Sequence, residues 1–120
     1  MNRTIKFRGW STSLKKWHFG YLVQLHGGTW INDGNIALLV DPESVGQMID
    51  VVELEIGKHQ EIYEGDIISR PAADLTYTVI YAEKYAQFMA RDIDGDEVPL
   101  STIVFSEVIG NIYDKKSIQD

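Results

Sequence analysis

Basic and aromatic side chains alternate near the start of the chain. Lys6, Arg8 and Trp10 occupy every second position, so in a strand they point to one side. Cations beside an exposed ring can contact a protein partner, or follow the phosphates of a single-stranded nucleic acid while the ring stacks on a base. We therefore take Lys6, Arg8 and Trp10 as a candidate interaction surface. In an alternative interpretation, Trp10 packs under a neighbouring loop and the cations pair with acids such as Asp92 or Glu107.

The sequence offers no residue set for covalent or metal chemistry. It has no cysteine, which excludes a zinc–thiolate site, and no serine placed between glycines as in a nucleophile elbow. His18, His26 and His59 do not have the spacing of paired metal ligands on one helix or strand. We expect His18 to be a surface imidazole. The sequence thus predicts no catalytic residue, no metal site and no cofactor, and the protein is not expected to be an enzyme.

Two acidic clusters resemble functional sites without having their spacing. Between Asp92 and Glu97, Gly95 stands fourth, whereas a calcium loop has its glycine sixth and a glutamate at the twelfth place. We expect this segment to be an exposed hairpin tip. Glu64 and Asp66 flank a glycine, where carboxylates usually satisfy the backbone donors of a tight turn.

Strands must position these residues, because apolar side chains recur with period two along most of the chain. From Trp17 to Leu25 the odd positions are all bulky, which predicts that Trp17, Phe19 and Tyr21 face the core. That would leave Trp10 and Trp30 as the rings able to stack on a base. The fold class expected is mainly β, a small SH3-like barrel or roll of short antiparallel strands.

At most one short helix is expected, near residues 42–48. Asp41 is a favourable N-cap, Pro42 suits the first helical position, and Gly46 argues against a long helix. The 120 residues fit a single domain, 1–120, with a tail after about residue 114 that frays.

Charge and hydropathy limit the classes of partner that the chain can bind. The formal net charge of −7 disfavours nucleic acid, but residues 1–32 hold five basic side chains and no acid, so a basic N-terminal face keeps that partner open. The longest aliphatic run, residues 36–40, is far shorter than the roughly 20 residues that span a bilayer. With no apolar stretch at the start and no cysteine, we expect a soluble cytoplasmic protein without a membrane partner.

Four segments together resemble the YopX family of small bacteriophage and prophage proteins. They occur in the family's order and cover nearly the whole chain: residues 5–10, 41–47, 61–67 and 107–113. The chain departs from the family pattern after Gln47, where residues 48–55 replace a Thr-Gly and a polar turn. If residues 48–55 form a binding surface, this chain would bind a different partner from other members of the family.

The resemblance implies an SH3-type β fold and a phage or prophage origin, and it implies no enzymatic activity. Among the family's recurrent residues, Gly65 would supply a turn and Gly110 a kink, while Phe7 and Ile109 would pack in the core. We therefore expect a non-enzymatic accessory protein in a bacterial host cell that binds a host or phage protein. The alternative is a small nucleic-acid-associated β-barrel that uses the basic N-terminal face.

Overall fold

The computed structural model describes residues 5–55, 58–70, 75–100 and 107–113, and most of them lie in strands. The mainly β class expected from the sequence is confirmed. One helical turn, η1 (Pro42–Ser44), follows the fourth strand. The strands in chain order are β1 (Phe7–Ser11), β2 (Lys16–Leu25), β3 (Gly28–Asn32), β4 (Ala37–Leu39), β5 (Gly46–Glu55), β6 (Lys58–Tyr63), β7 (Asp66–Arg70), β8 (Leu75–Ala82), β9 (Gln87–Arg91), β10 (Glu97–Pro99) and β11 (Glu107–Asn111).

The strands are short and antiparallel, as expected, but they lie in two open sheets rather than in one closed barrel. Their orders are β4-β3-β2-β1-β5-β6 and β10-β9-β8-β7-β11. Within the described residues, the two edge strands of each sheet do not pair with each other. The strand pairing therefore does not close either sheet into the SH3-like barrel expected from the sequence.

The chain divides into two compact units, residues 1–48 and 49–120. The division falls inside β5, whose first residues belong to one unit and whose later residues belong to the other. The single domain expected from the sequence stays a prediction, which calorimetry can test.

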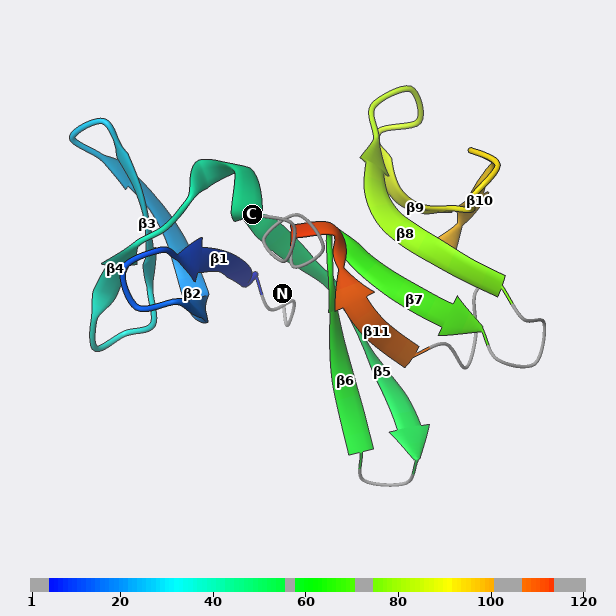
Figure 1. Ribbon diagram of the computed structural model, residues 1–120, viewed down its shortest axis with the longest axis horizontal. Helices are drawn as coiled ribbons and strands as arrows, with labels where there is room; N and C mark the ends of the chain where they lie inside the picture. Colours follow the sequence, from blue (N-terminus) through cyan, green and yellow to red (C-terminus); the bar gives the residue numbers. More distant parts are fainter. Residues whose placement is uncertain (1–4, 56–57, 71–74, 101–106, 114–120) are drawn as a thin grey trace. The chain divides into compact units, whose positions relative to one another are not determined.

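In the first unit, β1 to β4 form a meander in which each strand pairs with the next (Figure 1). Gly20 is the residue at which β2 passes from pairing with β1 to pairing with β3, because Gly20 pairs with Phe7 and Tyr21 pairs with Asn32. A Cβ atom at Gly20 would lie 2.2 Å from the backbone oxygen of Asn32. Only glycine permits this close approach of two backbones.

The core of the first unit lies on the even-numbered side of β2, and the expectation that the odd-numbered residues face the core is wrong. His18 is buried, so it is not the surface imidazole expected from the sequence. Ile31 of β3 is fully buried and pairs with Leu22, which shares the side of His18. On the odd-numbered side, Tyr21 is 66% exposed.

Glycine at the centre of β1 explains which side of the sheet is filled. Gly9 pairs with His18, so its missing side chain leaves space on the core side. The side chain of Val40 occupies that space, and a Cβ atom at Gly9 would lie 2.7 Å from its Cγ2. Val40 itself is buried. The core therefore forms on the side where the branched side chain of Val40 packs against Gly9.

The helical turn η1 is shorter than expected. Asp41 caps it as predicted, since its Oδ1 accepts a hydrogen bond from the Glu43 amide at 3.0 Å. The turn ends at Ser44 and does not continue to Met48, because Val45 is extended and β5 begins at Gly46. The backbone from Gly46 onward is used instead for pairing with β1.

The turn between β2 and β3 has left-handed backbone at both central residues, with φ of 53° at His26 and 76° at Gly27. This is the geometry of a type I′ hairpin, which favours Asn-Gly. We expect His26→Asn to raise the free energy of unfolding by about 0.5 kcal/mol, because asparagine tolerates positive φ better than histidine. Urea unfolding measures this change. Gly27→Ala is the opposing control and lowers stability; an equal response from both variants would contradict the assigned turn.

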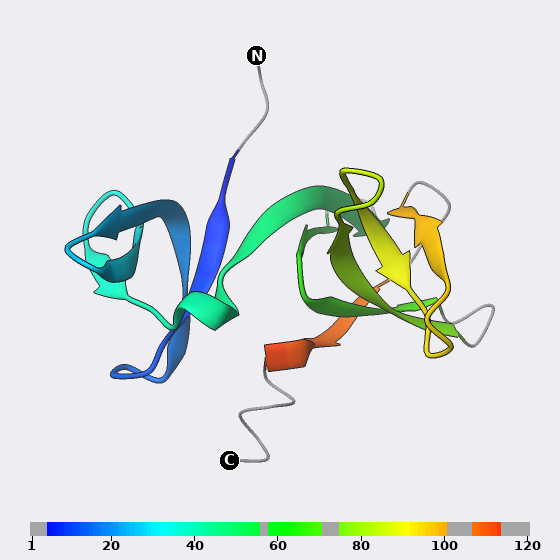
Figure 2. The same ribbon diagram turned by 90° about the horizontal axis from the view of Figure 1, so that it is seen from above.

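In the second unit, β7 to β10 form a meander, and β11 pairs along the other edge of β7 (Figure 2). Partly buried apolar residues from β5, β10 and β11 pack around the centre of this unit, among them Ile49, Val98 and Val108. The centre itself consists of buried residues from β6 to β9: Ile62, Ile68, Tyr77, Val79 and Ala90.

The turn at Gly65 is formed as the sequence predicts. Gly65 has a φ of 92°, and the buried carboxylate of Asp66 accepts a hydrogen bond from the Tyr63 amide at 2.7 Å. The Gly65 amide donates to the carbonyl of Val79, and its carbonyl accepts from the Ile112 amide. Tyr63 is 2% exposed, so the prediction that it is at least half buried is confirmed.

One apolar residue expected in the core, Ile109, is at the surface. Ile109 is 57% exposed because a bulge separates Val108 from Gly110 in the pairing of β11 with β7. The frayed tail expected after residue 114 lies outside the described residues.

Candidate interaction surface

One side of the first unit's sheet collects basic and aromatic residues from two neighbouring strands. Arg8 pairs with Phe19 and Trp10 pairs with Trp17, and residues opposite each other in an antiparallel pair share a side. Alternation along each strand adds Lys6 and Tyr21 to that side. We call this surface the aromatic face; it consists of Lys6, Arg8, Trp10, Trp17, Phe19 and Tyr21.

The two cations of the aromatic face lie against its rings. The guanidinium carbon of Arg8 is 4.8 Å from the centre of the Trp17 ring, and Arg8 is only 8% exposed. The Lys6 ammonium lies 5.7 Å from the centre of the Phe19 ring. Such cation–ring contacts hold a charged group where it has lost part of its water. Arg8 therefore has less reach toward a partner than its position in the sequence suggests.

Trp10 is fixed at both its backbone and its ring. Its amide donates to the Ser44 hydroxyl at 2.7 Å, and its carbonyl accepts from the Asp41 amide at 2.9 Å. Its ring meets Trp17 edge to face, with centroids 5.4 Å apart. Trp10 is half-buried beside η1. Trp10 thus packs beside a neighbouring loop, as in the alternative interpretation, while its ring stays on the aromatic face.

Phe19 and Tyr21 are the exposed rings of the aromatic face, since these residues are 39% and 66% exposed while Trp10 and Trp17 are half-buried. They line a pocket of about 330 Å³ together with Ile5, Lys6, Gly20 and Asp33. A pocket with aromatic walls and one group of each charge can hold a side chain from a partner. It lies at the end of the aromatic face formed by Lys6 and Tyr21.

Asp33 is held in place by the turn that follows β3. Its Oδ1 accepts hydrogen bonds from the amides of Ile36 and Asn35, both at 2.8 Å. These two bonds lower the pKa of Asp33 below its usual value, so the carboxylate stays ionised at neutral pH. Its Oδ2 lies 3.7 Å from Nε2 of the buried His18. The negative charge of the pocket is thus fixed in position.

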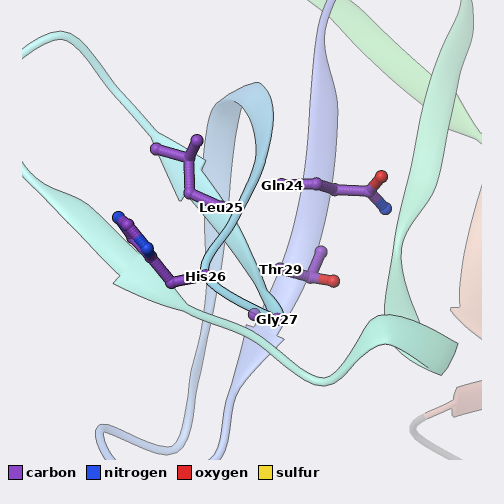
Figure 3. A pocket seen from close by; sticks show the side chains of 6 residues that line it. Gln24, Leu25, His26, Gly27 and Thr29 are labelled. Carbon is purple, nitrogen blue, oxygen red and sulfur yellow. The ribbon is translucent and has the colours of Figure 1, made fainter.

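A second hollow, of about 280 Å³, surrounds the turn between β2 and β3. Figure 3 shows Leu25 and His26 on one side of this turn and Gln24 and Thr29 on the other. All of its lining comes from six consecutive residues, 24–29, of one hairpin. Such a hollow follows from the shape of the turn, and we assign no site to it.

The acidic segment after β9 is the exposed hairpin tip predicted from the sequence. The Oδ1 of Asp92 accepts hydrogen bonds from the amides of Asp94 and Asp96, and Gly95 has a φ of 89°. Asp94 and Asp96 are exposed. The described residues contain no group of three or more histidine, aspartate or glutamate side chains placed to hold a metal ion.

Sequence reasoning placed Lys6, Arg8 and Trp10 on one side of β1, and the structure brings all three together. It missed Trp17, Phe19 and Tyr21, which were expected in the core. The signal that could have found them is the short turn between β1 and β2. Residues 12–15 set Trp10 opposite Trp17, so the odd positions of β2 share a side with the cations.

The comparison with known families covers nearly all of the sequence. The model of the family described as YopX protein matches residues 6–117. No curated protein matches the chain. In the part of the chain that the structure describes, no helix has the length and apolar character needed to cross a membrane. The chain belongs to the YopX family.

Proposed function

We propose that this chain is a non-enzymatic accessory protein of phage or prophage origin that binds a host or phage protein in the bacterial cytoplasm. The aromatic face is the proposed contact surface. The observation that carries the proposal is the exposure of Phe19 and Tyr21 beside the pocket that holds Lys6 and Asp33. Exposed rings next to a pocket are typical of the anchoring residues in protein interfaces.

The charge of the aromatic face favours a protein over a nucleic acid. Proteins that bind single strands need cations that reach phosphates as well as rings that stack on bases. Here Arg8 is buried against Trp17, which leaves Lys6 as the more accessible of the two. The fixed carboxylate of Asp33 beside Lys6 would repel a phosphate. A protein partner can match both charges.

A matched pair of double variants tests the proposal. Lys6→Glu with Tyr21→Ser changes the aromatic face, while Lys84→Glu with Tyr85→Ser changes an exposed lysine–tyrosine contact in the second unit. We expect the first variant to lose about 2 kcal/mol or more of binding free energy, roughly thirtyfold in affinity, and the control to bind normally.

The partner is first captured from host or phage-infected cell extract by the immobilised wild-type chain, and its affinity for each purified variant is then measured by calorimetry. Arg8 is left unchanged, because its removal would expose Trp17 and disturb the fold. Equal affinities of the two double variants would place the contact elsewhere.

A nucleic-acid-associated role is the second candidate, supported by five basic against three acidic residues in the first unit. Fluorescence anisotropy with single-stranded DNA and RNA, at 50 mM and 200 mM salt, separates the two. Phosphate-driven binding weakens steeply with salt and is lost in the Lys6→Glu variant. Absence of oligonucleotide binding leaves the protein partner as the function to pursue.

A further inference from the structure

The edge strand β4 is only three residues long, but it carries none of the charges, prolines or bulges that usually protect a sheet edge. The described sheets end in β4, β6, β10 and β11. β6 contains Glu61, β10 contains Glu97 and Pro99, and β11 contains a bulge. Charges, proline and bulges prevent edge strands from pairing with another chain. Among the four described edges, β4 alone has none of these, and its surroundings from residue 36 to 40 are entirely aliphatic.

The backbone groups of β4 point alternately toward β3 and away from it. The Val40 amide donates to Thr29, and the Ile36 carbonyl accepts from the Asp33 amide. In an antiparallel ladder, residues that bond to a neighbour alternate with residues that do not. Ala37 and Leu39 therefore direct their N–H and C=O groups to the outer edge. Leu39 is also 52% exposed.

We propose that two copies of this chain associate through β4, antiparallel and centred on Leu38. In that register, Ala37 of one copy lies opposite Leu39 of the other, and both pairs direct their N–H and C=O groups outward. Four inter-chain hydrogen bonds form. The small side chain of Ala37 faces the large one of Leu39, and no charge opposes another. A second copy is thus an occupant whose backbone and side chains complement this edge.

The twofold pairing would place two aromatic faces on the same side of one sheet. Leu39 pairs with Trp30, and Trp30 pairs with Val23, which shares the side of Tyr21. Opposite residues of an antiparallel pair share a side, so the side of Tyr21 continues into the second copy. If the aromatic face binds a protein as proposed above, the dimer would be bivalent toward it. The dimer itself does not depend on that function.

The dimer is expected to be weak. A pair of three-residue strands buries less than the roughly 1,000 Å² of a stable interface, so monomer and dimer exchange. Each copy has a net charge of −7, so salt that screens their repulsion strengthens the dimer. Binding to a nucleic acid would respond to salt in the opposite direction.

Sedimentation equilibrium of the full chain, over micromolar to millimolar concentrations, tests the proposal with three variants. Leu39→Pro removes an outward N–H but no bond to β3, and it is expected to weaken the dimer by about tenfold or more. Leu39→Val keeps the N–H and should dimerise normally. Ala37→Lys adds an edge charge without changing the backbone, and it serves as a second test if Leu39→Pro does not fold.

A wild-type chain that stays monomeric throughout would overturn the inference. So would a dimer that Leu39→Pro and Ala37→Lys leave unchanged, or one that weakens as salt is added. A monomeric chain that gains a partner's extended segment at β4 would assign the edge to a different occupant. Capture of a partner by the aromatic face is measured in a separate experiment. If either the dimer or the captured partner is not found, the other result can still be interpreted.

Discussion

Replacing Gly20 with alanine is expected to lower the free energy of unfolding by about 3 kcal/mol, a large share of a small domain's stability. The new Cβ atom would lie 2.2 Å from the backbone oxygen of Asn32, and backbone cannot rotate away as a side chain can. β2 and β3 would have to separate at the point where β2 changes partner. Urea unfolding followed by tryptophan fluorescence measures the loss, because the tryptophans all lie in this unit.

Gly34→Ala is the matched control for Gly20→Ala. Gly34 also has positive φ, 101°, but no atom lies within 4 Å of its added Cβ. Only the backbone strain remains, which costs about 1 kcal/mol. If both variants lose the same amount, the close approach of β2 and β3 does not set the stability of this sheet.

Gly65→Val is expected to lower the free energy of unfolding by about 2 kcal/mol. Gly65 has a φ of 92°, and a β-branched side chain is strongly disfavoured there. The turn also holds the buried Asp66 carboxylate on the Tyr63 amide and connects to Val79, so strain at Gly65 reaches the core of the second unit. Gly65→Asn should lose less, because asparagine tolerates positive φ. Equal losses for valine and asparagine would show that the backbone strain is not the cause.

The two glycine variants also test the prediction of a single domain. Gly20 lies in the first unit and Gly65 in the second. If the chain unfolds cooperatively, differential scanning calorimetry gives one transition, and each variant lowers its temperature. Two transitions, each moved by only one of the variants, would show that the units unfold separately.

Periodicity in the sequence predicted the strands, but it could not decide which side of β2 is the core. Both sides carry apolar side chains, with Phe19 and Tyr21 on one and Leu22 on the other. The choice depends on how Gly9 admits Val40, a contact between residues 31 positions apart. Local patterns do not contain such contacts. The turn at Gly65 was predictable because its geometry depends on neighbouring residues.

The candidate site, like the fold, was predictable only in part. Alternation alone placed Lys6, Arg8 and Trp10 on one side of a strand. Whether Arg8 is exposed depends on Trp17, which meets it only through the register of β1 with β2. The sequence therefore predicted Lys6, Arg8 and Trp10, while the part played by Trp17, Phe19 and Tyr21 followed from the strand pairing.

The position of β5 has a consequence for how this sequence can recombine. Boundaries between compact units usually fall in exposed linkers, where a gene can be cut and rejoined without harm. Here the boundary between residues 48 and 49 cuts a strand, and the Met48 amide is bonded to the Lys6 carbonyl at 2.8 Å. A crossover at that codon would join half-strands from two parents, and the two halves would have to keep a common register. The two units are therefore expected to be inherited together, and exchange between related genes should be tolerated at the hairpin tips instead.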